Sequence, residues 1–341
     1  MVEGWHSIGL IVNQSAGKGA DLAFRAARDA LCSLEAQEVL TGSGELGQVA
    51  VANWSGRIAI HDVGAVVSRE RTQSLAKWIA GQDPHALIVV GGDGTLADVA
   101  QVLIEQNCLV PILGIGSGST NVGRLITCRA NEVWKLDPAK LERWNVDCLT
   151  ALVNGELSGR AFNDVVIGYT VVGTIEGKLC DLDAAERSRG ILVAGTPRSI
   201  ATPESRVTRN TKNGATIVAQ AESVGTVVAG FAEPTFFGKA VCGGICLAAL
   251  TGLPAGCLVS NLPLVQVEIG AGTLARTIPI VSSYVSLGED ITVMVEKVQE
   301  GAVLCVDGNP VRELGPSDRV VISVNKDAVR GVRFQKDQRP T

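Results

Sequence analysis

A short run of small and polar residues, Gly91-Gly92-Asp93-Gly94-Thr95, follows the apolar segment 86–90. This pattern is typical of a buried strand, a tight turn and a helix, and we expect Thr95 to cap that helix together with Asp98. Glycines let a phosphate approach the backbone, and the start of a helix offers free N–H groups to an anion. Asp93 suits Mg²⁺ held through water, or a proton taken from a hydroxyl that is being phosphorylated. The residues alone leave a plain turn with a solvated Asp93 equally open.

Two further glycine-bearing turns follow apolar segments. Residues 7–13 end in Asn13 and lead into Gln14-Ser15-Ala16-Gly17-Lys18-Gly19, and residues 110–114 lead into the turn 115–121. The first turn is not a Walker A loop, and neither turn has the dinucleotide fingerprint, which disfavours an ordinary dehydrogenase. Lys18 can reach a phosphate, although an exposed loop lysine explains it as well.

Strand and helix signals alternate about four times over the first 125 residues, with an irregular stretch at 35–54. This alternation predicts an open parallel sheet, whose ligands bind at the carboxyl ends of the strands. All three turns fall at predicted strand ends, so we expect them to converge on a nucleotide or polyphosphate site. The residues expected to bind its phosphates are Asn13, Ser15, Gly17, Lys18, Gly91, Gly92, Gly94, Thr95, Gly116, Ser117, Gly118, Ser119, Thr120 and Asn121.

The second half of the chain has a different pattern. Short β-rich runs begin near residue 146, and several end in turn dipeptides such as Asn154-Gly155, Asn213-Gly214 and Asp307-Gly308. This pattern predicts a β-rich, sandwich-like domain. We therefore expect an α/β domain over 1–128 and a β-rich domain over 129–341. Asn163-Asp164 stands at the entry of one apolar strand, where it can bind a ribose or an amide, although turn chemistry alone explains it.

Composition narrows the class of protein. Hydrophobic residues make up 46% and charged residues 19% of the 341 residues, and the net charge of −5 argues against nucleic acid as a partner. No apolar run reaches the roughly 18 residues of a membrane span, and the first residues do not resemble a signal peptide. We expect a cytoplasmic protein with no membrane partner. Nine cysteines and three histidines show no metal-binding spacing, so we expect no directly bound metal and buried, reduced thiols.

Taken together, these motifs resemble the NAD kinase and diacylglycerol kinase superfamily. The similar segments are 13–19, 91–95, 113–125, 162–165 and 303–308. The resemblance implies the superfamily's two-domain fold with an active site in the interdomain cleft. It also implies ATP or polyphosphate with Mg²⁺ as the donor, small-molecule substrates such as NAD, and a homo-oligomer. Asp93 would then activate the acceptor hydroxyl, and the acceptor would be held by Asn163, Asp164, Thr235 and Lys239.

Within the superfamily, the chain is most similar to divergent ATP-NAD-kinase-like proteins that include acetoin-catabolism protein X. This similarity implies phosphorylation of NAD or a related small molecule, in acetoin catabolism. Two departures keep alternatives open. The segment 233–240 carries two phenylalanines and a lysine where NAD kinases have small hydroxyl residues, and Asn309 replaces the catalytic glutamate of lipid kinases. A non-catalytic nucleotide- or metabolite-binding module and a lipid kinase are the alternatives.

Overall fold

The computed structural model describes residues 5–14, 19–64, 68–118, 121, 123–175, 178–232, 247–263 and 281–335. The chain divides into two compact units. The first combines Met1–Asp147 with Asp327–Thr341, and the second is Cys148–Lys326. These units differ from the expected division at residue 128. Residues just beyond that point still belong to the first core, to which Val133 contributes, and the end of the chain returns to the same core through Val332.

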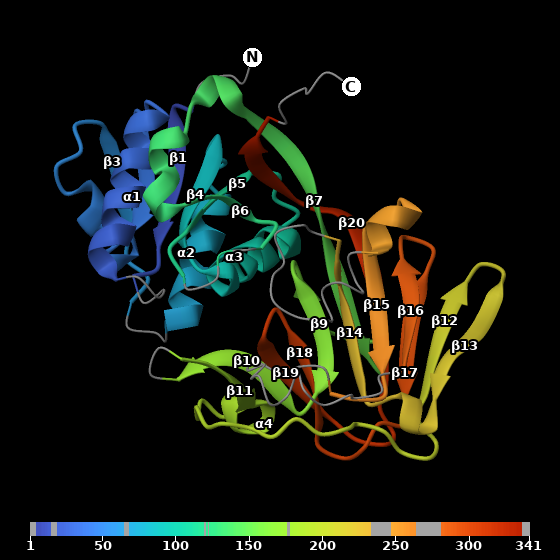
Figure 1. Ribbon diagram of the computed structural model, residues 1–341. Coiled ribbons are helices and arrows are strands. Elements are labelled where there is room, and N and C mark those ends of the chain that lie inside the picture. Colours follow the sequence, from blue (N-terminus) through green and yellow to red (C-terminus); the bar gives the residue numbers. More distant parts are fainter. Residues whose placement is uncertain are drawn as a thin grey trace, which may run out of the picture. The chain divides into compact units, whose positions relative to one another are not determined.

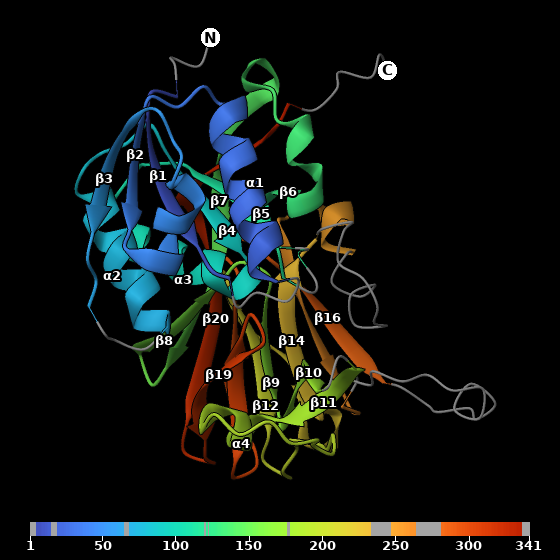
Figure 2. The ribbon, with the colours of Figure 1, turned by 90° about the vertical axis from the view of Figure 1, so that its left-hand side faces the viewer.

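The first unit contains a parallel sheet with the strand order β3-β2-β1-β4-β5, and β6 pairs with β5 (Figure 1). The helix α1 packs on one face of this sheet, over Ile8 and Leu10, and α2 lies on the other face, where Ile79 contacts Gly9. Figure 2 shows α1 in front of the sheet. The elements are β1 (Ser7–Val12), α1 (Ala20–Ser33), β2 (Glu38–Gly42), β3 (Arg57–His61), α2 (Ser68–Ala80), β4 (Ala86–Gly91), α3 (Asp93–Glu105), β5 (Ile112–Gly116) and β6 (Ile126–Arg129), with 3-10 helices at Gly44–Leu46, Gln48–Val51, Ala130–Lys135 and Pro138–Lys140.

The expected parallel sheet is confirmed, with two strands, β2 and β6, that the sequence did not predict. β2 lies inside the stretch 35–54, which we expected to be irregular. It has only five residues, and a glycine and two 3-10 helices follow it, so no periodic pattern could develop. β2 is held by its neighbours on both sides, because it pairs in parallel with β1 and with β3.

The second unit is built from antiparallel strands, as predicted. One sheet has the order β16-β15-β14-β9-β18-β19, and a second layer contains β13-β12-β17-β20 with β7 and β8. Both layers contribute to one apolar core, for example Ile167 from β9 and Ile322 from β20. The elements are β7 (Leu141–Val153), β8 (Glu156–Ala161), β9 (Asp164–Gly168), β10 (Thr170–Ile175), β11 (Lys178–Asp183), α4 (Ala184–Ser188), β12 (Arg206–Thr211), β13 (Gly214–Gln220), β14 (Thr226–Phe231), β15 (Ala255–Ser260), β16 (Ser282–Leu287), β17 (Thr292–Glu296), β18 (Ala302–Val306), β19 (Asn309–Leu314) and β20 (Arg319–Phe334), with 3-10 helices at Ala221–Ser223 and Leu247–Thr251.

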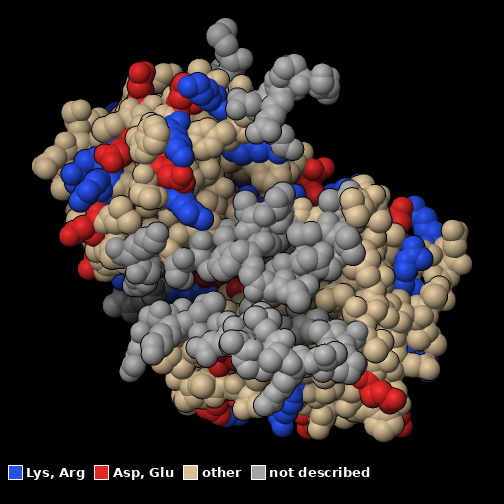
Figure 3. Space-filling model, viewed as in Figure 1, with Lys and Arg blue, Asp and Glu red and all other residues tan. Residues whose placement is uncertain are grey.

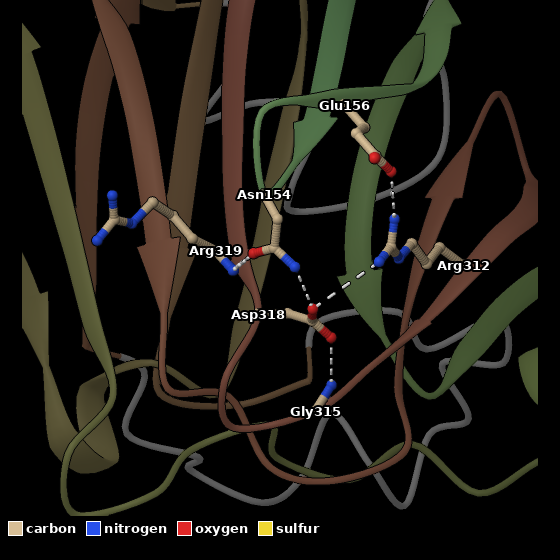
Figure 4. A network of polar contacts seen from close by, with 6 residues as sticks. All are labelled: Asn154, Glu156, Arg312, Gly315, Asp318 and Arg319. Atoms are coloured by element: carbon tan, nitrogen blue, oxygen red, sulfur yellow. Dashed lines mark hydrogen bonds and ion pairs between the residues drawn. The ribbon is translucent and has the colours of Figure 1, made fainter.

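Two turns of the second unit are joined by a polar network (Figure 4). Asn154, in the turn between β7 and β8, donates from Nδ2 to Asp318 Oδ1 at 2.7 Å and accepts from the Arg319 N–H at 3.0 Å. Asp318 Oδ2 also accepts from the Gly315 N–H at 2.9 Å, which lowers the pKa of the Asp318 carboxyl. The network therefore fixes the β7–β8 turn against the β19–β20 turn. Arg312 extends it with longer contacts to Asp318 and Glu156.

Charged side chains of both signs are interspersed over the face of the protein that Figure 3 shows. Surface ion pairs include Arg57–Glu38 at 3.1 Å and Lys212–Asp290 at 2.9 Å. Exposed pairs of this kind contribute about 0–1 kcal/mol each, so the apolar cores dominate the stability. Within the described ranges, no helix is long and apolar enough to cross a membrane.

The expectation that the cysteines are buried holds for only some of those that the structure describes. Cys128, Cys148, Cys257 and Cys305 are buried, and burial raises the pKa of the Cys257 thiol to about 12. Cys32, however, is exposed, because α1 turns its alanine face toward the core and leaves position 32 outside. Cys108 and Cys180 are half-buried, and the remaining two, Cys242 and Cys246, lie outside the described residues.

Candidate functional site

Three strand ends meet at one edge of the parallel sheet. The strand order changes direction between β1 and β4, which is where ligands of such sheets bind. The Asn13 N–H donates to the Val90 carbonyl at 2.8 Å, and the Ser117 N–H donates to the Gly91 carbonyl at 2.9 Å. The ends of β1, β4 and β5 are therefore side by side, as the sequence predicts.

Two of the predicted turns touch through their glycines. A Cβ atom at Gly118 would lie 2.9 Å from the Cα of Gly92, and a Cβ atom at Gly92 would lie 3.6 Å from the Cα of Gly118. The two backbones approach so closely because neither residue has a side chain. Gly116 is needed for a different reason, because its Cβ atom would lie 2.6 Å from the Cβ of Asn121.

The Asp93 carboxylate lies at the start of α3, next to both turns. Asp93 is the first helical residue, and Gly92 precedes it as a cap without a side chain. Asp93 is half-buried, and its Oδ1 accepts a hydrogen bond from the Gly123 N–H at 2.9 Å. The carboxylate is thus tied to the segment that follows the third turn, beside the positive end of the helix dipole.

The expected capping box is wrong. α3 begins two residues before Thr95, so this side chain lies within the first turn, where its Oγ1 accepts from Asn13 Nδ2 at 2.8 Å. Asp98 instead pairs with Arg69 at 2.7 Å. The hydroxyl that we expected to cap the helix therefore joins the ends of β1 and β4.

Two predicted phosphate ligands, Ser117 and Asn121, are buried. Ser117 is fully buried, and its Oγ has no hydrogen-bond partner within the described residues. Asn121 folds back on Gly118, accepting from its N–H at 2.8 Å and donating to its carbonyl at 2.6 Å. Both side chains shape the third turn. Ser15, Gly17, Lys18, Ser119 and Thr120 lie outside the described residues.

A pair of arginines near this site was not singled out by the sequence analysis. Arg124 follows the residue that donates to Asp93, and its side chain is only 11% exposed. It lies 5.4 Å from the Trp144 ring and pairs with Asp147 at 3.9 Å. Arg333 lies 4.8 Å from the same ring, and it comes from the last strand of the chain. No local pattern could have brought these residues together.

In the second unit, the turn that carries Asn163 and Asp164 is held by Asp307. The Asp307 carboxylate accepts from the N–H groups of Phe162, Asn163 and Asp164, at 2.9, 2.8 and 3.1 Å. The Asp307 N–H in turn donates to the Asp164 carbonyl at 2.9 Å. The sequence analysis noted Asp307 in a hairpin turn and in the similar segment 303–308, but it did not predict these partners, which are far away along the chain. Thr235 lies outside the described residues, as does Lys239.

The electrostatics of this turn are unusual. Burial raises the pKa of the Asp307 carboxyl to about 7, and the neighbouring Asp164 carboxylate raises it further, while the three N–H donors act in the opposite direction. The Asn163 Oδ1 atom is buried and has no hydrogen-bond partner in the part of the chain that the structure describes. Asn309 is close by, and its Nδ2 donates to the Asp307 carbonyl at 3.4 Å.

Comparisons with known proteins agree with this fold and these motifs. Residues 7–135 match the diacylglycerol kinase catalytic domain. An uncharacterized protein of Archaeoglobus fulgidus is 30% identical over 272 residues, which cover 80% of this chain and 81% of that protein. An NAD kinase of Acidobacterium capsulatum is 28% identical over 151 residues, which cover 40% of this chain and 50% of that protein. The part of the chain that the family model covers, residues 7–135, belongs to the NAD kinase/diacylglycerol kinase-like superfamily.

Solved structures of this superfamily share the fold across nearly the whole chain. A diacylglycerol kinase from Bacillus anthracis has a TM-score of 0.51 at 12% identity, covering 98% of both chains. The yeast NADH kinase complexed with NADH has a TM-score of 0.53 at 11% identity, covering 98% of this chain and 85% of that one. Membership of the superfamily supports a phosphotransferase, and it leaves the acceptor to be argued from the site.

Proposed function

We propose that the chain is a kinase that transfers a phosphoryl group from ATP or polyphosphate to a hydroxyl of NAD or a related small molecule. The observation that supports this most directly is the meeting of three glycine-bearing strand ends around Asp93. The backbone of Gly91, Gly92 and Gly94, together with the start of α3, would receive the donor phosphates. Asp93 would orient the acceptor hydroxyl or take its proton, and positioning would supply most of the rate.

The donor set of the turn is compatible with Mg²⁺ carried by the nucleotide. Asp93 provides the hard carboxylate oxygen that Mg²⁺ prefers, while the glycines provide N–H groups that suit phosphate oxygens. One carboxylate does not make an all-protein cage, and Mg²⁺ commonly keeps several of its waters. The ion would therefore neutralise the phosphates and contact Asp93 through water.

The test is the Asp93→Asn variant, assayed with ATP, Mg²⁺ and a panel of NAD and polyols. We expect turnover to fall by at least ~10²-fold, because the amide cannot accept the hydroxyl proton. Nucleotide affinity should change little, because the phosphates would be held by backbone groups. Asp98→Asn is a matched control on the same helix, since Asp98 is bonded to Arg69 away from the turn. Unchanged turnover in Asp93→Asn would remove Asp93 from the chemistry.

A non-catalytic nucleotide- or metabolite-binding module is the main alternative. The altered segment 233–240 favours it, because it lacks the hydroxyl residues of NAD kinases. The same assay separates the two functions. Nucleotide-dependent thermal stabilisation without product from any acceptor would favour the module.

A lipid kinase is the third candidate, and the match to the diacylglycerol kinase catalytic domain favours it. Against it, the residue after Asp307-Gly308 is Asn309, whose amide cannot act as a base where lipid kinases have glutamate. Phosphorylation of a short-chain diacylglycerol would overrule this argument.

A role in acetoin catabolism rests on the resemblance to acetoin-catabolism protein X, and growth of a deletion strain on acetoin would test it.

A further inference from the structure

The side chain of Arg160 lies on the face of its hairpin that is turned away from the apolar core. In the pairing of β7 with β8, Arg160 lies opposite Thr150, and Ala161 lies opposite Leu149. Ala161 and Leu149 belong to the core of the second unit. Because side chains alternate between the two faces of a strand, Arg160 and Thr150 share the other face, together with Cys148.

Two donors of the Arg160 guanidinium lack an acceptor in the part of the chain that the structure describes. Its Nε and Nη1 atoms are both buried, and neither has a hydrogen-bond partner among the described residues. A guanidinium remains charged and cannot relieve this situation by losing a proton. Buried charged donors are normally paired, so an unpaired one in a folded protein indicates a missing partner.

Arg160 lies close in the sequence to the turn that carries Asn163 and Asp164. It precedes Asn163 by three residues, on the strand that enters the turn held by Asp307. The neighbouring Gly159 faces Val306, because a Cβ atom at Gly159 would lie 2.9 Å from Val306 Cγ2. The end of β8 therefore packs against the end of β18, immediately before Asp307.

The electrostatic environment of the Cys148 thiol links Arg160 with Asp307. Burial raises the pKa of the Cys148 thiol to about 11, while the Arg160 guanidinium lowers this pKa and the Asp307 carboxylate raises it. Both charges must therefore lie near one sulfur atom. Asn163 Oδ1, three residues further along the chain, is also buried without a hydrogen-bond partner in the described residues.

We propose that Arg160 binds an anionic group of the acceptor molecule, while Asn163 Oδ1 accepts a hydrogen bond from one of its hydroxyl or amide groups. The identification of this molecule as the phosphoryl acceptor rests on the proposed kinase function. The inference selects the substrate class, since it requires a phosphate or carboxylate on the molecule that carries the reactive hydroxyl. A dinucleotide or a sugar phosphate meets this requirement, and a neutral diacylglycerol does not.

The binding test uses calorimetric titration of the full-length protein with NAD, with ribose 5-phosphate and with neutral ribose. In Arg160→Gln we expect at least tenfold weaker binding of both phosphate-bearing probes, because the charged donors are lost. Arg160→Lys should bind with intermediate affinity, since lysine keeps the charge without the planar fork. Arg206→Gln, at an exposed position on β12 of the same unit, is the matched control and should bind like the unchanged protein.

Equal affinity in the unchanged protein and in Arg160→Gln would overturn the inference, because the probes would then bind elsewhere, for example at the turns of the first unit. Ribose that binds as tightly as ribose 5-phosphate would also overturn it. These measurements need no turnover. If the affinity depends on Arg160 but the protein has no kinase activity, the proposed function is contradicted and the anion-binding role of Arg160 is supported.

A second measurement uses the ligand-free protein. Arg160→Met removes two buried charged donors that lack an acceptor among the described residues, so we expect the melting temperature to rise while the stabilisation by ribose 5-phosphate disappears. If Arg160 had a purely structural role, the melting temperature of Arg160→Met would fall and the stabilisation by ribose 5-phosphate would remain. A lower melting temperature in Arg160→Met would show that the guanidinium is satisfied within the protein, and it would contradict the inference.

Discussion

At the scale of single residues, Asp307 controls the geometry of the Asn163–Asp164 turn. The turn itself was visible in the sequence, because Asn and Asp at a strand entry are typical of turns. Its anchor was not visible, since the hydrogen bond between Asp307 and Asn163 joins residues 144 positions apart. Local patterns report on neighbours along the chain, so a carboxylate that acts at such a distance is found only when the fold is known.

The raised pKa of Asp307 leads to a prediction about pH. Its folded value of about 7 lies above the ordinary value, so the folded protein holds this proton more tightly than the unfolded chain. The stabilising contribution of the protonated group is complete below about pH 4, and it is lost as the pH rises through 7. In urea unfolding, the stability difference between the unchanged protein and Asp307→Asn should therefore shrink from pH 4 to pH 7.

Asp318 offers a matched control with the opposite sign. The Gly315 N–H lowers the pKa of the Asp318 carboxyl, so its contribution is present above about pH 4 and is lost only as the pH falls further. The stability difference for Asp318→Asn should stay constant from pH 5 to pH 8. A difference for Asp307→Asn that is equally constant over this range would contradict the assignment of the raised pKa.

At the scale of elements, the strand–turn–helix units were predictable because each one is local. The apolar run of β4, the glycines and the α3 periodicity follow one another in the sequence, and the structure forms the expected strand and helix, with α3 beginning already at Asp93. The details of the turn were less predictable. Thr95 was expected at the helix start by its spacing to Asp98, yet its hydroxyl binds Asn13, which belongs to another strand end.

The contact between the turns predicts the effect of a methyl group. In Gly118→Ala the new Cβ would meet the Gly92 backbone at 2.9 Å, so one turn must shift. We expect a loss of about 1–3 kcal/mol in the free energy of unfolding, together with weaker nucleotide binding. Chemical denaturation and a nucleotide titration measure the two effects.

Gly81→Ala is the control for that variant. The nearest atom to its new Cβ would be the Trp78 carbonyl oxygen at 3.5 Å, an ordinary contact. We expect this variant to stay within about 0.5 kcal/mol of the unchanged protein. If Gly118→Ala behaves in the same way, the close approach of the two turns does not constrain the site.

At the scale of the whole molecule, the two units were predictable in class and not in extent. Hairpin dipeptides predicted the β-rich unit, and the alternation of strand and helix signals predicted the parallel sheet. The boundary could not be read from composition, because the chain leaves the first unit through β7 and returns to it through β20. There Gly331 pairs with Ile112, and the Val332 carbonyl accepts from Thr127 Oγ1 at 2.6 Å.

This return predicts that a substitution near the end of the chain destabilises the first unit. Val332 is 3% exposed and packs in the core that contains Ile8. In Val332→Ala we expect a loss of about 1–3 kcal/mol in the free energy of unfolding, measured by denaturant titration. Val311→Ala, at a position that is 39% exposed on β19, should cost less than about 0.5 kcal/mol. Equal losses in both variants would mean that Val332 does not complete the core.

The path of β20 also sets the order in which the chain can become native during synthesis. The first unit contains Val332, so its core is complete only after residue 332 has left the ribosome. Residues 148–326 are continuous and are all available earlier. The sheet of the first unit therefore stays incomplete while residues 148–326 are synthesised, and its unpaired strands are exposed to aggregation during that time.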